Sequence, residues 1–255
     1  MLLDAWRLAV GTLTAVPVSP PRAVDTSRAR LALLLAPPAT APLGLLVAGL
    51  LAAGHAVGLA PAVVALLAVG AVALGTRGMH LDGLSDVADG LAASYDRERA
   101  LTVMKSGTSG PAGTVAVFVV LGLQTAGLAG LASSPGGWRA AVLAGVVVCA
   151  SRAAVLWCGL RGVGPARADG LGRPFTETIP LGLAALVWVA VAALVALVGA
   201  WAGLPWWRGA VATVAAALAV GAVVGCAVRR FGGVTGDVFG AAIEAGLAAM
   251  LGALS

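Results

Sequence analysis

Residues 31–76 read LALLLAPPATAPLGLLVAGLLAAGHAVGLAPAVVALLAVGAVALGT, without a single Lys, Arg, Asp or Glu. A helix needs about 20 predominantly apolar residues to cross the hydrocarbon core of a bilayer. The stretch is therefore long enough for two crossings, joined by a turn between Gly54 and Pro61. This part of the sequence predicts a helical hairpin in a membrane.

Apolar and charged stretches continue to alternate along the 255 residues. A short helix is predicted within the first twenty residues, ending near Pro17, because proline disrupts a helix interior. Four further spans are predicted, at about 112–132, 140–160, 180–202 and 209–228.

The composition agrees with a membrane protein. Hydrophobic residues make up 60% and charged residues 11% of the chain, and the mean hydropathy is +1.00. Soluble domains have roughly 45–50% apolar and about 25% charged residues. These values exclude an ordinary soluble enzyme, and the missing polar–apolar alternation excludes an outer-membrane barrel. We expect an all-α fold: a polytopic helical integral membrane protein with about six to seven transmembrane helices, forming one domain over residues 1–255.

The charged residues predict the orientation of this domain. If the spans alternate, one side carries the loops that hold twelve of the sixteen Lys and Arg residues, whereas the opposite loops carry only Arg139 and Arg208. The positive-inside rule places the charged side in the cytoplasm, for a multi-pass protein of the cell membrane. Nine of the eleven acids follow residue 80, mostly in these loops. We therefore expect a cytoplasmic active site in loops 77–111, 161–179 and 229–244.

The net charge of +5 and the pI of about 10.1 do not indicate nucleic acid in this setting. The basic residues are scattered beside apolar spans, so membrane lipids are their expected partners. No basic run with interleaved aromatic residues, typical of nucleic-acid binding, is present. A homo-oligomer is compatible with the sequence.

The most informative stretch covers residues 78–91, GMHLDGLSDVADGL. Its acids Asp82, Asp86 and Asp89 are spaced i, i+4 and i+7, which places them on one face of a helix. Three carboxylates on one face repel each other, and their neighbours are apolar. A divalent cation such as Mg²⁺ or Mn²⁺ would neutralise them. The alternative is an exposed amphipathic helix with three unrelated acids. Three roles stay open for His80: a metal ligand, a contact to a substrate phosphate, or a polar residue at the start of the helix.

A second stretch covers residues 229–244, RRFGGVTGDVFGAAIE. Its glycines let the backbone approach a phosphate, so Thr235 and Gly236 are candidate substrate-binding residues. Asp237 is either a further metal ligand or the N-cap of a helix.

Basic residues near the acids are candidates for binding phosphate groups. Lys105 follows the first acidic stretch and Arg77 precedes it, and Arg161, Arg167 and Arg173 lie in the third charged loop. The alternative for each is plain positive-inside charge. Arg152 differs, because it lies within a predicted span and needs a partner or a water-filled cavity there.

Residues 80–90, HLDGLSDVADG, resemble the His-x-Asp-Gly-Leu-x-Asp-x-x-Asp-Gly motif of the cobalamin synthases, the adenosylcobinamide-GDP ribazoletransferases. Residues 98–105, ERALTVMK, resemble the segment that follows in that family. Residues 232–241, GGVTGDVFGA, resemble its C-terminal motif. The resemblance extends over nearly the whole chain. One departure is Ser106-Gly107-Thr108, where the family usually carries an Asp or Arg.

The resemblance implies a Mg²⁺-dependent transfer in the last steps of cobalamin biosynthesis. Adenosylcobinamide-GDP and α-ribazole, or its 5′-phosphate, are joined to give adenosylcobalamin or its 5′-phosphate, and GMP leaves. Read together with the acidic stretch, it assigns the metal to Asp82, Asp86, Asp89 and Asp237, with one carboxylate, for instance Asp89, as proton acceptor. Lys105 and Arg77 would hold the pyrophosphate. 

Two alternatives stay open at this point. A membrane phosphotransferase of the CDP-alcohol type also lines a helix face with aspartates, although its usual Asp-Gly-x-x-Ala-Arg start is not met, because Ser85-Asp86 follow Asp82-Gly83-Leu84. A cation or small-molecule transporter would place its acids near the middle of the membrane, whereas these acids lie at the edge of a span.

Overall fold

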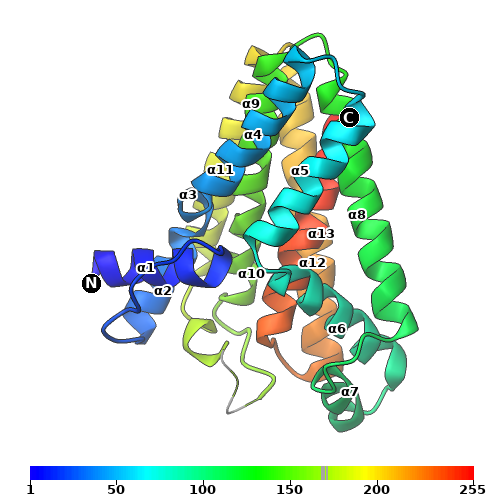
Figure 1. Ribbon diagram of the computed structural model, residues 1–255. Helices are drawn as coiled ribbons and strands as arrows, with labels where there is room; N and C mark the ends of the chain where they lie inside the picture. Colours follow the sequence, from blue (N-terminus) through cyan, green and yellow to red (C-terminus); the bar gives the residue numbers. More distant parts are fainter. Residues whose placement is uncertain (168–169, 171) are drawn as a thin grey trace.

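The computed structural model describes residues 1–167, 170 and 172–255. Residues 168–169 and 171, within the predicted loop 161–179, lie outside the described residues. In the described part of the chain all regular secondary structure is helical, apart from two isolated β-bridges. The fold is the predicted all-α bundle (Figure 1).

The long helices run along the bundle (Figure 1). They are α4 (Ala41–Ala56), α5 (Pro61–Gly75), α8 (Pro111–Ala132), α9 (Trp138–Ala150), α11 (Leu181–Trp201), α12 (Trp206–Phe231) and α13 (Gly236–Leu254). The other elements are α1 (Leu2–Leu13), α2 (Thr26–Leu34), α3 (Ala36–Ala39), α6 (Met79–Ala93), α7 (Arg97–Met104), η1 (Ser151–Ala154), α10 (Val155–Cys158) and η2 (Arg173–Phe175).

Among the described residues, five segments are long and apolar enough to cross a membrane: α8, residues Trp138–Cys158, α11, α12 and α13. The pair α5 and α6 is a sixth candidate, bent by 89°, and α4 is a shorter apolar helix. This confirms a polytopic helical membrane protein. The predicted short N-terminal helix is also found, as α1.

The charge-free stretch 31–76 contains the predicted hairpin, α4 and α5, but Pro37 and Pro38 interrupt its start, so α4 begins only at Ala41. One helix was missed. The predicted spans ended at residue 228, whereas α13 adds a further, largely buried apolar helix after it. Its acids Asp237 and Glu244 made its first half look like a charged loop.

The charged loops lie together at one end of the bundle. α6, α7, the connection from α10 to α11 and the turn between α12 and α13 are all found there (Figure 1). The connections from α4 to α5, α8 to α9 and α11 to α12 lie at the other end. The alternation predicted from the sequence thus holds, and the chemistry-bearing residues are at one end.

A sharp bend directs α6 away from α5. Arg77 and Gly78 both adopt positive φ angles, of 56° and 69°. Glycine adopts this conformation freely, whereas arginine does so at a cost. Arg77 is held there by its own guanidinium, whose Nη2 donates to the carbonyl oxygen of Gly11 at 3.1 Å. The bend is therefore tied to the end of α1.

Helices α6 and α13 touch backbone to backbone. A Cβ atom on Gly83 would lie 2.6 Å from the carbonyl oxygen of Asp237, and a Cβ on Gly240 would lie 2.9 Å from the Cα of His80. Only glycine permits so close an approach. The contact brings Asp82 of α6 beside Asp237 of α13.

This contact predicts unequal effects of alanine at two glycines of α13. Gly240→Ala should lower the thermal denaturation midpoint of the detergent-purified protein, because the backbone of His80 cannot move aside cheaply. Gly252→Ala is the matched control, since a Cβ there meets nothing within 4 Å. It should leave the midpoint unchanged or raise it, as alanine favours a helix by about 1 kcal/mol over glycine. A Gly240→Ala variant as stable as the control would contradict the contact.

Candidate active site

Four carboxylates meet where α6 packs on α13. Asp82 is exposed, Asp86 is half-buried and Asp89 is buried, and Asp237 stands in the first turn of α13. The negative charges of Asp82, Asp237 and Asp89 all repel that of Asp86, and Arg167 offsets this repulsion only in part. Uncompensated negative charge of this kind favours cation binding.

Asp89 has a different environment from the other carboxylates. Its Oδ2 accepts a hydrogen bond from the backbone N–H of Gly110 at 2.6 Å, and its Oδ1 accepts one from Gly113 at 2.8 Å. These donors belong to the start of α8, where backbone N–H groups lack partners within the helix and carry partial positive charge. Asp89 therefore anchors α8 to α6.

The start of α13 is positioned by the loop before α11. Val234 donates its N–H to the carbonyl oxygen of Gly164 at 3.0 Å, and Ala166 donates to that of Val234 at 2.9 Å. This pairing holds Arg167 close enough to Asp237 for the two charges to attract. Thr235 completes the turn, because its Oγ1 donates to Asp237 Oδ2 at 3.0 Å.

A basic cavity of about 250 Å³ opens at this turn. Its charged and polar lining residues come from three separate segments: Lys105, Arg167, Arg173, Thr235 and Asp237. The backbone of Gly236 adds the first turn of a helix, a favourable place for an anion. The predicted phosphate-binding residues Lys105, Thr235 and Gly236 are thus brought together.

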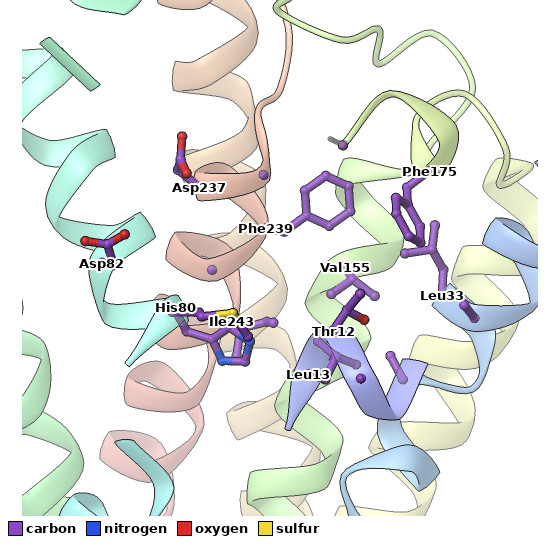
Figure 2. Close-up of a pocket in the computed structure, with 17 residues that line it drawn as sticks. Thr12, Leu13, Leu33, His80, Asp82, Val155, Phe175, Asp237, Phe239 and Ile243 are labelled. Atoms are coloured by element: carbon purple, nitrogen blue, oxygen red, sulfur yellow. The ribbon is translucent and has the colours of Figure 1, made fainter. Parts of the chain in front are cut away.

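A second, larger cavity of about 440 Å³ adjoins the first. Both are lined by Gly172, Gly236 and Asp237. Figure 2 shows Asp82 and Asp237 on one side of this cavity and the rings of Phe175 and Phe239 across from them. Asp237 therefore stands between a basic cavity and a mainly apolar one.

His80 lines the larger cavity and also faces a buried polar group formed by Glu244 and Gln124. Its Nδ1 is 3.6 Å from Glu244 Oε1, longer than a hydrogen bond. Gln124, the only amide side chain in the sequence, donates from Nε2 to Glu244 Oε2 at 2.7 Å. Sequence reasoning missed Gln124, although an amide inside a span was a usable signal.

Arg152 belongs to this buried region and lines neither cavity. It is fully buried, and its Nη1 donates to the carbonyl oxygen of Val148 at 2.7 Å and to Ser151 Oγ at 2.9 Å. Nε and Nη2 have no hydrogen-bond partner in the described part of the chain. Glu244 is the carboxylate that attracts its charge. Polar groups inside the protein thus meet the predicted need of Arg152 for partners only in part.

Arg77 is also placed away from the two cavities. It clamps α1, as described above, and lines neither cavity. Conversely, Arg167 was predicted only as one of several loop arginines. Its guanidinium borders the basic cavity and also donates to the carbonyl oxygen of Leu101.

The carboxylates suit a hard divalent cation by their chemistry. Among the described residues, no group of three or more His, Cys, Asp or Glu side chains is arranged to hold a metal ion. Mg²⁺ is usually bound by only one or two carboxylates, with water and substrate phosphates completing its shell. Asp237, which lines both cavities, and Asp82, which lines the larger one, fit this mode of binding.

The chain is similar to known proteins over nearly its full length. A family model described as CobS, cobalamin-5-phosphate synthase, matches residues 5–255. A relative from a Nocardioides species is 54% identical over 250 residues, which cover 97% of this chain and 96% of the relative. Relatives from Frankia casuarinae (36% identical, 98% and 94% covered) and Halorubrum lacusprofundi (39%, 96% and 93%) also match.

All three relatives are named adenosylcobinamide-GDP ribazoletransferase. No solved structure matches the chain. The match covers both aspartate-bearing stretches, α6 and the start of α13, that the fold brings together. This chain therefore belongs to the CobS family of cobalamin-5-phosphate synthases.

Proposed function

We propose that this enzyme joins adenosylcobinamide-GDP to α-ribazole or α-ribazole 5′-phosphate, with release of GMP and with Mg²⁺ as cofactor. Membership of a transferase family supports the reaction. The observation that carries the assignment to this site is that Asp237 lines one cavity together with Asp82 and the adjoining cavity together with Lys105 and Arg167. The relatives' names do not favour the CDP-alcohol phosphotransferase or the transporter.

The proposed reaction is a phosphoryl transfer. A ribose hydroxyl oxygen of the acceptor forms a bond to the phosphorus that carries the cobinamide. The bond from that phosphorus to the bridging oxygen breaks, and GMP leaves with the electron pair. Such reactions are catalysed mainly by positioning and by neutralising charge. The cation, when bound, supplies positive charge to the phosphate oxygens.

The protein's own residues divide this work. Lys105 and Arg167 bind the diphosphate in the basic cavity, where Arg173 also contributes to the lining. Asp82 and Asp237 hold the cation. Asp86, on the same face of α6 as Asp82, accepts the hydroxyl proton, because its partial burial and the negative charges around it raise its pKa to about 6. Asp89 acts as a positioning residue through α8.

The first prediction from this proposal concerns the reaction. Purified protein in liposomes, given adenosylcobinamide-GDP, α-ribazole 5′-phosphate and Mg²⁺, should release GMP only when both substrates are present. EDTA should stop the release and excess Mg²⁺ should restore it. Asp86→Asn should lower kcat by roughly 10²–10⁴-fold, the range for loss of a general base. Glu98→Gln, an exposed acid on α7, is the control. EDTA-resistant GMP release would contradict the cofactor proposal.

The second prediction separates Asp89 from the catalytic carboxylates. Asp89→Ala removes both acceptors at the start of α8, which should cost about 0.5–2 kcal/mol of stability and lower the thermal midpoint without any substrate. Asp82→Ala should leave the midpoint unchanged or raise it, because it relieves repulsion. Equal midpoints for the two variants would show that Asp89 does not anchor α8.

The third prediction concerns orientation. We propose that the end bearing α6 and α7 faces the cytoplasm, as the positive-inside rule indicates. In a background without Cys149, Cys158 and Cys226, Ser106→Cys should react with an impermeant maleimide only after cells are opened. Ser133→Cys, at the opposite end of α8, should react in intact cells. The reverse pattern would contradict the proposed orientation.

A further inference from the structure

We propose that the larger cavity binds the flat, apolar base of the nucleoside acceptor, with its ribose directed toward Asp82 and Asp237. This inference rests on the proposed function and assigns one substrate to one part of the site. The described residues provide two adjoining cavities of opposite character, and the reaction has two substrates whose reacting ends must meet.

The walls of this cavity suit an aromatic ring. Leu13, Leu33 and Ile243 contribute aliphatic surface from α1, α2 and α13. Phe175 and Phe239 pack edge to face, with ring centroids 6.2 Å apart and planes at 68°. Flat apolar ligands gain stability both from burial and from contact with such rings.

The polar groups that remain for a ligand are concentrated on one side. Thr12 donates its hydroxyl to the carbonyl oxygen of Leu8 at 2.7 Å, within its own helix. His80 faces Glu244 in the buried polar group. Asp82 and Asp237 are therefore the charged side chains of this lining (Figure 2). A ligand with one apolar end and one hydroxyl-bearing end matches that distribution.

Size distinguishes the candidates for this cavity. Its volume of about 440 Å³ is in the lower part of the range for ligand pockets, roughly 300–1,000 Å³. A nucleoside fits this volume, whereas a corrin macrocycle is much larger. Guanine has many hydrogen-bonding atoms, which would lie unpaired against Leu13, Leu33 and Ile243. The nucleoside acceptor is the substrate that meets both conditions.

The two cavities also have the right relation for the reaction. Gly172, Gly236 and Asp237 border both. An acceptor held in the apolar cavity presents its ribose at Asp237, and a diphosphate held by Lys105 and Arg167 ends at the same residue. The attacking hydroxyl and the phosphorus are thereby brought together.

The N-terminal helix has a defined part in this arrangement, since Thr12 and Leu13 form one wall. Its end is fixed by Arg77, which donates to Gly11, and by Ala15, whose N–H donates to the carbonyl oxygen of Gly75 at 2.6 Å. Arg77 therefore shapes the acceptor cavity indirectly.

The test measures binding and turnover separately. α-Ribazole, the riboside of 5,6-dimethylbenzimidazole, serves as the probe in equilibrium dialysis with the detergent-purified protein and without the second substrate. Phe239→Ala should weaken its binding about tenfold, the scale of a lost base–aromatic contact. Phe118→Ala is the matched control and should bind normally, because the side chain of Phe118 on α8 is 78% exposed and lines neither cavity. Free 5,6-dimethylbenzimidazole should compete with the probe, and adenosine should compete less.

In turnover, Phe239→Ala should raise KM for α-ribazole and leave KM for adenosylcobinamide-GDP unchanged. Lys105→Ala should instead raise KM for adenosylcobinamide-GDP and leave KM for α-ribazole unchanged. Phe239→Leu, which keeps apolar volume without the ring, should lie between Phe239→Ala and the wild type. If the wild type releases GMP but Phe239→Ala and Phe118→Ala bind α-ribazole with equal affinity, the cavity assignment alone is overturned. Probe binding that depends on Phe239, without GMP release by the wild type, would instead support the cavity and contradict the proposed transfer.

Discussion

The direct backbone contact between α6 and α13 determines where the acids of this protein stand. Gly83 and Gly240 leave no side chain between the two helices, so carboxylates from distant parts of the sequence face the same space. Bringing like charges together in a partly buried place is unfavourable unless something compensates them. Much of the surrounding structure can be understood as that compensation.

Three acids near the contact each have a different counterpart. Asp89 receives backbone N–H groups from the start of α8, Asp237 receives the Thr235 hydroxyl and the attraction of Arg167, and Glu244 receives the amide of Gln124. Among the described residues, Asp82 and Asp86 make no such hydrogen bond, and Asp82 lines the larger cavity. Under our proposal, a cation and the substrate phosphates fill this remaining need, which couples the packing of the helices to the chemistry.

Much of this organisation was predictable from sequence, because it depends on local patterns. The apolar runs predicted most spans, the uneven charge predicted which loops share an end, and the i, i+4, i+7 spacing predicted one face for Asp82, Asp86 and Asp89. What was missed depends on tertiary contacts. Asp89 turns toward Gly110 and Gly113 of another helix, and Arg77 reaches back to Gly11, contacts that no local pattern reveals. α13 was missed because two acids interrupt an otherwise apolar helix.

The central claim is that Asp82 of α6 and Asp237 of α13 together hold one divalent cation. Electron paramagnetic resonance of Mn²⁺ added to the purified protein measures that binding without turnover. The account predicts that the bound Mn²⁺ signal is lost in Asp82→Asn and in Asp237→Asn alike, and is retained in Glu98→Gln. Bound Mn²⁺ that is unaffected by either aspartate substitution would contradict it.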